Sequence, residues 1–338
     1  MSFLKNFLIL ILAVCQSVMS FAQTSTTSIN PSEPEAVSSL NNIDDFQPLT
    51  NFAVAQLIPA YKIALKKGMF EAFAGIGHID GSKETNRGQS VYIKTSPQTD
   101  FFPVQFAYGL TDNTNISFSG KAMRTLDKVA NSSYEGTSEP QFAISHTIKT
   151  NNSAININGS YSAANGPKTN NSYGITRTEG NTLTGGASGE LTGGYFTRLD
   201  PVILGGEVAY LYKDSRIINR ESSDIFTHKS LGINQIRIEG GNEKTLRGII
   251  ELAFPFRIGM TFGRTWVEQE EELILYQSTS TLHDSFYRNF VSGYARFQVN
   301  PRLSILPSIA YSVAPDTSYQ TSKNDQEMSS QINLRYRF

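Results

Sequence analysis

From Met69 onward, apolar and polar residues alternate with a period of two along most of the chain. Such alternation predicts β-strands whose two faces meet different environments. The C-terminal stretch 328–338 is the clearest example, with one face formed by Ile332, Leu334, Tyr336 and Phe338. Soluble β-sandwiches also alternate, so this pattern predicts strands without deciding between a sandwich and a barrel.

The lengths of the connections separate the two folds. Short polar links at 111–114, 150–153, 198–201, 255–257 and 300–302 alternate with longer polar segments at 80–99, 125–137, 164–180, 214–244, 269–284 and 314–327. Outer-membrane barrels combine tight periplasmic turns with long extracellular loops, whereas a sandwich does not sort its loops by length. The pattern therefore favours the barrel.

Twelve strands are predicted near 69–79, 101–110, 115–124, 138–149, 154–163, 182–197, 202–213, 245–255, 258–268, 285–299, 303–313 and 328–338. An even number of strands places the start of the first strand and the end of the last strand on the short-turn side, as in bacterial barrels. The stretch Leu231 to Glu239 also resembles a strand, either as a hairpin extension above the membrane or as part of two further strands. The predicted fold class is all-β, a closed antiparallel transmembrane β-barrel of about 12 strands, with 14 possible.

Composition and charge exclude other classes. Only 17% of the 338 residues are charged, and 26 Gly, 15 Tyr and 21 Phe suit a β-rich protein. With 29 basic and 30 acidic residues the formal charge is -1, which gives no electrostatic footprint for nucleic acid. After the first fifteen residues, no stretch approaches the roughly 18 consecutive apolar residues of a membrane-spanning helix.

The N-terminal region divides into two parts before the barrel at 68–338. Residues 1–22 have the charged start, apolar core and Ser20-Phe21-Ala22 cleavage pattern of a secretory signal peptide. Residues 23–67 are predicted to be a flexible periplasmic segment or a plug, because their first part is polar and rich in Ser, Thr and Pro. The apolar residues of 51–67 have no clean period, so a plug, a short helix and an extension of the first strand all stay open.

Two motifs resemble known outer-membrane barrels. The terminal Tyr336-Arg337-Phe338 looks like the C-terminal signal of Gram-negative outer-membrane β-barrels. The hairpin from Phe102 to Phe118, with its Tyr-Gly-Leu-Thr-Asp sequence, is similar to that of transporter-like barrels that include the meta-pathway phenol-degradation family. This resemblance implies export to the outer membrane, contact with its lipids and the barrel assembly machinery, and passage of small solutes.

If the apolar face contacts lipid, the other face lines the lumen and carries charges of both signs. The predicted lumen-lining charges are Glu71, Lys121, Glu190, Glu207, Arg247, Glu251, Arg288, Arg296, Arg335 and Arg337. They could form an acidic wall facing a basic wall across a polar passage, or neutralise one another and fill the interior. Because the first and last strands must pair, we expect Arg335 or Arg337 beside Glu71.

Arg264 and Trp266 share the parity of the apolar face, so they are predicted to lie outward at the outer membrane interface. An arginine facing lipid costs least near an interface. A β-bulge at Gly263 that turns Arg264 inward is the alternative.

The sequence predicts a channel or transporter for small solutes and no enzyme. A non-conducting structural, adhesion or assembly barrel is the main alternative, and an outer-membrane lipid hydrolase using His228 and Ser230 is a remote one. The four histidines are scattered and the only cysteine is Cys15, so neither a metal site nor a cofactor is predicted.

Overall fold

The computed structural model of the chain describes residues 57–86, 92–127, 132–138, 140–163, 170–173, 187–223, 230–253, 256–274, 279–314 and 322–338. The predicted signal peptide at 1–22 and most of the segment at 23–67 lie outside the described residues. Within the described ranges, no helix has both the length and the apolar character needed to cross a membrane.

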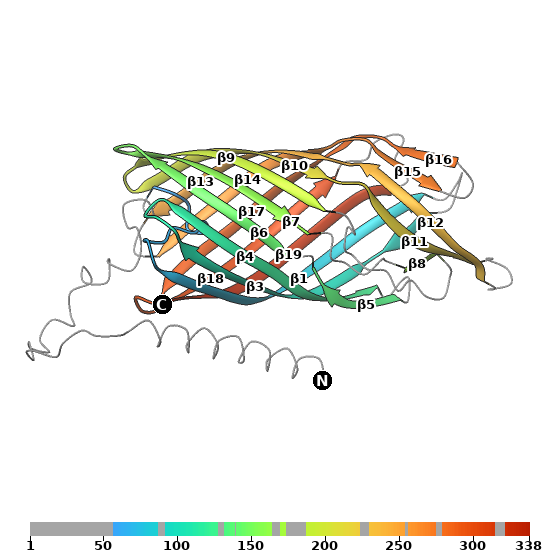
Figure 1. Cartoon of the computed structure of the whole chain (residues 1–338), viewed down its shortest axis with the longest axis horizontal. Coiled ribbons are helices and arrows are strands. Elements are labelled where there is room, and N and C mark those ends of the chain that lie inside the picture. Colours follow the sequence, from blue (N-terminus) through green and yellow to red (C-terminus); the bar gives the residue numbers. More distant parts are fainter. Residues whose placement is uncertain are drawn as a thin grey trace, which may run out of the picture. The chain divides into compact units, whose positions relative to one another are not determined.

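Twelve of the described strands form one closed antiparallel barrel, as Figure 1 shows. They are β1 (Phe70–Asn86), β3 (Pro97–Gly109), β4 (Thr114–Asp127), β6 (Gln141–Lys149), β7 (Ser153–Ser162), β9 (Ser188–Leu199), β10 (Val202–Lys213), β13 (Glu243–Ala253), β14 (Arg257–Val267), β17 (Phe286–Gln298), β18 (Leu303–Ala314) and β19 (Ser322–Arg337). Each barrel strand pairs with its neighbour in the chain order, and β1 pairs with β19. The predicted fold class is confirmed.

Closure follows the register that the alternating pattern implies. The pairing of β1 with β19 begins at Glu71 opposite Arg337 and runs to Thr85 opposite Ser322, with one irregularity between Ser82 and Glu84. Because facing residues share a parity, the polar face of β19 continues onto one face of β1. That face is the inner one.

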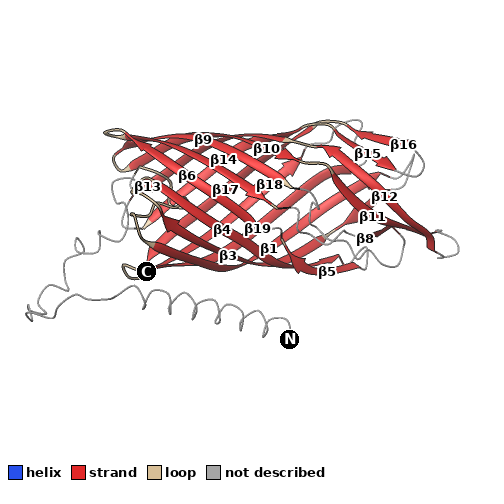
Figure 2. Ribbon diagram, viewed as in Figure 1, coloured by secondary structure: helices blue, strands red, loops and turns tan. Residues whose placement is uncertain are grey.

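Shorter strands extend the long loops. Strands β2 (Tyr92–Thr95) and β5 (Ser132–Thr137) pair with β1 and β4, and a separate five-stranded sheet contains β8 (Asn170–Tyr173), β11 (Arg216–Ser223), β12 (Ser230–Gly240), β15 (Glu270–Ile274) and β16 (Thr279–His283). Figure 2 shows this sheet at the end opposite the C-terminus. The strand-like stretch 231–239 belongs to it, so it is an extension and not a thirteenth or fourteenth barrel strand among the described residues.

We call the two ends of the barrel by their connections. At the short-turn end the strands are joined by few residues, as between Leu199 and Val202, and this end also holds the start of β1 and the end of β19. At the long-loop end the strands continue into the five-stranded sheet. Short turns are typical of the periplasmic side of outer-membrane barrels.

The barrel is apolar outside and polar inside. On β13 the outward-facing Leu246, Ile250 and Leu252 are 41–52% exposed, whereas Glu251, between two of them in sequence, is 0% exposed. This is the reverse of a soluble protein, in which large contiguous apolar surface is covered by other protein. Hydrocarbon is the environment that such an outer face requires.

Candidate functional site in the barrel lumen

The residues just before the barrel, 57–67, lie inside its short-turn end, and we call them the luminal segment. Its apolar residues Leu57, Ile58, Ala60, Ala64 and Leu65 are all buried. Leu57, Ile58 and Ala64 belong to a core that also contains the inward-facing side chains Ala154, Phe196, Ile203 and Ile249. The segment therefore fills the lumen here with the same kind of packing that fills a protein interior.

The carboxylate of Glu251 holds the middle of the luminal segment. Its Oε2 atom accepts hydrogen bonds from the backbone N–H of Ala60 at 2.7 Å and from the hydroxyl of Tyr294 at 2.8 Å. Arg257 forms an ion pair with the same carboxylate and donates a hydrogen bond to the Ile58 carbonyl oxygen at 2.6 Å. A single acidic group thus links three barrel strands, β13, β14 and β17, to the segment.

A second carboxylate, Glu207, binds the next two residues of the segment. Its Oε2 accepts hydrogen bonds from the Tyr61 hydroxyl at 3.0 Å and from Arg247 at 2.9 Å, while Lys62 Nζ lies 2.5 Å from Oε1. Burial, reinforced by the negative charge of Glu207, raises the pKa of Tyr61 well above its ordinary value. The phenol therefore stays protonated and keeps its role as a donor.

The third anchor joins barrel closure to the luminal segment. Glu71 lies 3.0 Å from Arg335 Nε and accepts a hydrogen bond of 2.7 Å from Arg337, so the pairing expected from strand closure is present with both arginines. Arg335 also donates hydrogen bonds to the carbonyl oxygens of Ala60 at 3.2 Å and Tyr61 at 3.4 Å. The sequence did not predict this second role.

The segment then leaves the lumen near β4. Asn115 accepts a hydrogen bond from the Leu65 N–H and donates one to the Ile63 carbonyl oxygen, both at 3.2 Å. The chain turns into β1 at Gly68, whose φ of +83° lies in the left-handed region that other residues rarely adopt. Glycine at this position is what allows the segment to fold back into the barrel that it precedes.

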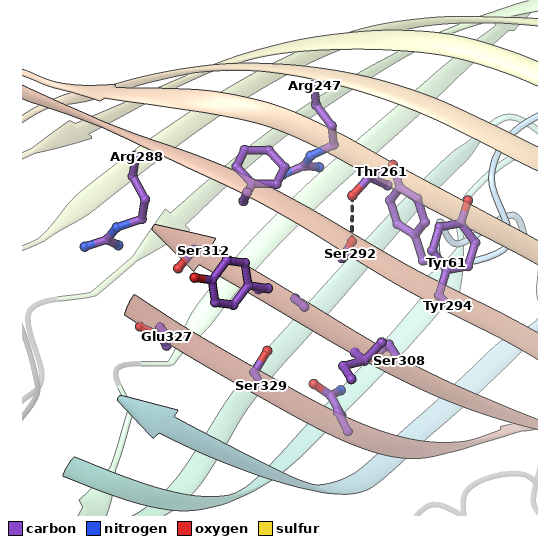
Figure 3. A pocket seen from close by; sticks show the side chains of 15 residues that line it. Tyr61, Arg247, Thr261, Arg288, Ser292, Tyr294, Ser308, Ser312, Glu327 and Ser329 are labelled. Atoms are coloured by element: carbon purple, nitrogen blue, oxygen red, sulfur yellow. Dashed lines mark hydrogen bonds between the residues drawn. The ribbon is translucent and has the colours of Figure 1, made fainter. Parts of the chain in front are cut away.

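A cavity of about 460 Å³ lies beside the luminal segment, and we call it the chamber. It is lined by Tyr61, Arg247, Thr261, Arg288, Phe290, Ser292, Tyr294, Ser308, Ile309, Ala310, Tyr311, Ser312, Glu327, Ser329 and Gln331. Figure 3 shows Tyr61 and Tyr294 together at one end and Arg288, Ser312 and Glu327 toward the other. Tyr61 therefore belongs both to the luminal segment and to the wall of the chamber.

One predicted acidic residue of the lumen, Glu190, lies away from these anchors. Glu190 faces Leu211 across the strand pair, four positions along β9 from Gly194, which faces Glu207, and its carboxylate accepts a hydrogen bond from Thr192 at 2.8 Å. The stagger of barrel strands thus separates Glu190 from Glu207 although the two residues lie on adjacent strands.

The remaining predicted basic residues differ in their surroundings. Lys121 Nζ lies 5.8 Å from the centre of the Phe101 ring, and Arg296 donates hydrogen bonds to Gln298 at 2.8 Å and to Ser304 at 3.4 Å. Arg288 lines the chamber. The acidic anchors have basic partners of their own, and Arg296 interacts electrostatically with Glu71 and with Arg257, Arg335 and Arg337.

Near the short-turn end, each of the three buried carboxylates Glu71, Glu207 and Glu251 therefore has at least one basic partner within the lumen. Two of the basic partners, Arg257 and Lys62, were not among the predicted lumen charges. Arg257 follows the short link after β13, and Lys62 belongs to a stretch without clear periodicity, so strand parity gave no signal for either. An unusually high density of charge beside a short turn was the available hint.

On the outer face, Arg264 and Trp266 lie as predicted from parity. The guanidinium carbon of Arg264 is 4.2 Å from the Tyr287 ring centre and 6.0 Å from that of Trp266, and its Nε donates to Asn289 at 2.8 Å. Strand β14 pairs with both neighbours without a register shift, so the bulge proposed at Gly263 is absent. Aromatic rings and an amide thus surround the outward arginine.

The proposed hydrolase pair is not described: His228 lies outside the described residues, and only the backbone of Ser230, the first residue of β12, is inside them. In the part of the chain that the structure describes, no group of three or more His, Cys, Asp or Glu is arranged to hold a metal ion.

Comparison with known proteins identifies the fold. No family model matches the sequence, and no curated protein matches it. Among solved structures, an outer-membrane channel from Pseudomonas putida F1 is similar with a TM-score of 0.59 at 14% identity, covering 83% of this chain and 98% of that one. The chain folds as an outer-membrane β-barrel.

Two further barrels are less similar. A deletion mutant of TodX, a monoaromatic hydrocarbon channel, has a TM-score of 0.45 at 8% identity and covers 80% of this chain and 91% of its own. The NanC porin has a TM-score of 0.41 at 9% identity, with coverage of 77% and 98%. These two structures are described as a channel and a porin. The fold and the apolar outer face of this barrel place it in an outer membrane.

Proposed function

We propose that this barrel is a channel for small solutes and that the luminal segment is its plug. The observation that carries the proposal is the division of the lumen into a filled part, where the segment is packed and hydrogen-bonded, and the open chamber of about 460 Å³ beside it. A barrel that served only as a scaffold has no need for a polar cavity that ends on a removable piece of chain.

The way in which the plug is held supports this function. Three carboxylates, Glu71, Glu207 and Glu251, carry most of the polar contacts, directly or through Arg335. Hydrogen bonds can be exchanged for solvent at modest net cost, whereas a strand of the barrel cannot leave without opening the sheet. Displacing the plug toward the short-turn end joins the chamber to the periplasm.

The contacts outside the lumen complete the proposal. Outer-membrane lipids cover the apolar outer face, with Arg264 and Trp266 at the outer interface, and the C-terminal Tyr336 and Phe338 are recognised by the barrel assembly machinery. The two terminal rings pack edge to face, with centres 4.8 Å apart, which presents them as one aromatic unit. No catalytic step is part of this proposal, and a lipid-hydrolysis assay of Ser230→Ala tests that exclusion.

Single-channel recording in planar bilayers tests the function with two matched truncations. Removal of 23–66 takes away the luminal segment, and removal of 23–56 leaves it in place. We expect large, steady currents only from the first. Equal currents from both variants, or silence from the shorter one despite a folded, heat-modifiable barrel on gels, contradicts the proposal.

A second candidate function is a non-conducting adhesion or assembly barrel, and the five-stranded sheet of the long-loop end is the observation that favours it. Excising 216–238 shortens this sheet without touching the twelve barrel strands. A loss of cell-surface attachment with unchanged currents favours adhesion, and unchanged attachment favours the channel.

A further inference from the structure

The chamber has the size of a binding site for a small molecule. Its volume of about 460 Å³ lies within the range of roughly 300–1,000 Å³ that is usual for ligand sites. Tyr61 forms part of its wall and its ring packs edge to face on Tyr294, with centres 5.1 Å apart and an interplanar angle of 82°. A solute that enters the lumen therefore meets a formed surface on the luminal segment.

The charges of the lining favour an anion. Arg247 and Arg288 contribute two positive charges against one negative charge from Glu327, which also interacts electrostatically with Lys121. Each guanidinium has five N–H donors, so Arg247 keeps donors for a solute while one of its groups binds Glu207. The planar fork of arginine matches the two oxygens of a carboxylate.

The rest of the polar lining consists of hydroxyl groups. Ser308, Ser312 and Ser329 come from β18 and β19, and Thr261 and Ser292 come from β14 and β17. The last two are within 2.6 Å of each other, so at least one can turn its proton toward a second acceptor. A hydroxyl both donates and accepts, and a solute with several hydroxyl groups can pair with such a wall at many positions.

We propose that the chamber binds small hydroxylated carboxylates, with the acid group on Arg288 and Arg247 and the solute hydroxyls on the serine and threonine wall (Figure 3). An apolar solute offers no hydrogen bonds to the hydroxyl groups of this wall. A neutral polyol offers no carboxylate to the two guanidinium groups. The two features together select one chemical class.

A solute bound in the chamber also affects the contacts that hold the plug, and this part of the inference rests on the proposed function. Arg247 and the Tyr61 hydroxyl share the Oε2 atom of Glu207. A solute carboxylate on the remaining donors of Arg247 shares the positive charge of the guanidinium with Glu207, and it lies against Tyr61. Occupation of the chamber thereby weakens one of the contacts that hold the luminal segment.

Calorimetry on the full mature protein in detergent tests the site with four probes. Gluconate is the hydroxylated carboxylate, sorbitol its neutral counterpart, hexanoate an acid without hydroxyls, and toluene an apolar solute. We expect gluconate to bind more tightly than each of the others by about tenfold or more. Equal or tighter binding of sorbitol, hexanoate or toluene overturns the assignment, as does no binding of gluconate.

Variants locate the binding in the lumen. Arg288→Gln should weaken gluconate about tenfold, Arg288→Lys should recover part of the loss, and Arg264→Gln on the outer face should have no effect. Ser308→Ala together with Ser312→Ala provides a second route if Arg288→Gln does not fold, and should weaken gluconate while leaving hexanoate unchanged. Full affinity in all lumen variants overturns the site.

The two proposals fail in different measurements. If the truncation of 23–66 conducts but gluconate does not bind, the channel stands and the solute class is wrong. If gluconate binds with the predicted dependence on Arg288 but the truncation is silent, the binding site stands and the plug does not.

Discussion

The two parts of the lumen are built on the same strands and yet have opposite characters. On β13, Glu251 accepts a hydrogen bond from the luminal segment, and on β17, Tyr294 donates one to Glu251 and packs on Tyr61. Arg288 and Ser292 line the chamber farther along β17. Glu71, Glu251 and Arg335 are at most 2% exposed. The inward face of a barrel strand is therefore not one environment, and its character depends on what lies against it.

This difference teaches where charge can be placed. Near the short-turn end the acids and bases are buried, so each needs a partner of opposite sign at close range. In the chamber, charged and hydroxyl side chains face an open volume and can turn toward a solute. The filled part of the lumen is a packed interior that is held together by hydrogen bonds and ion pairs. The chamber is a polar surface that faces an open volume.

The largest expected effect comes from removing the acid shared by two buried arginines. Glu71→Ala leaves Arg335 and Arg337 without their carboxylate, and we expect the barrel to lose about 3–5 kcal/mol of unfolding free energy. Urea unfolding in detergent micelles measures it. Asp80→Ala, on the outer face of the same strand, is the matched control, and an equal loss there would remove the contrast between buried and exposed charge.

The next largest effect is on the free energy of local opening of the luminal segment. Glu251→Gln keeps the shape but weakens a charge-assisted hydrogen bond to the Ala60 N–H, so local opening should become easier by about 1.5–3 kcal/mol. Amide hydrogen exchange at Ala60 measures this as an acceleration of roughly ten- to a hundredfold. Glu190→Gln changes a carboxylate that accepts a hydrogen bond from Thr192 on its own strand, and it should leave the exchange at Ala60 unchanged.

A smaller effect is expected where the two regions meet. A methyl group at Gly259 would overlap the ring of Tyr294, which bonds to Glu251 and packs on Tyr61. We expect Gly259→Ala to cost about 1–3 kcal/mol of stability through overpacking and to raise the frequency of channel opening. Gly120→Ala, where an added methyl group meets no atom within 4 Å, is the control. A silent Gly259→Ala would mean that Tyr294 does not support the plug.

The smallest effect lies outside both regions. Arg264→Ala removes a cation above the Tyr287 ring and a hydrogen bond to Asn289 at an exposed position, so the expected loss is only about 0.5–1 kcal/mol. Chamber binding and channel currents should not change. A large change in either would show that the outer face is coupled to the lumen.

The sequence was sufficient for the barrel because a period of two assigns each residue of a strand to one of two faces. It placed Arg335 or Arg337 beside Glu71 for the same reason, since closure leaves β1 as the remaining partner of β19 beside β18. It was not sufficient for the luminal segment. That segment contacts side chains of β4, β10, β13 and β19 at once, and no local period encodes contacts of that kind.

The extensions of the long loops were predicted only in part. The stretch 231–239 of β12 was recognised as strand-like, whereas β15, which begins with three consecutive glutamates, was assigned to a loop. Strands outside the membrane need no apolar face, so their pattern does not differ from that of a loop. The prediction was accurate where hydrocarbon imposes a pattern and inaccurate where water surrounds both faces.

Gly68 has a consequence for how the barrel recloses. Because the backbone reverses at this residue and continues directly into β1, the luminal segment is covalently tethered to the short-turn end of its own barrel. A tethered segment rebinds at an effective concentration on the order of millimolar or above, independent of the concentration of the protein. Rapid rebinding therefore limits the duration of each opening, and a single polypeptide contains both the pore and its plug.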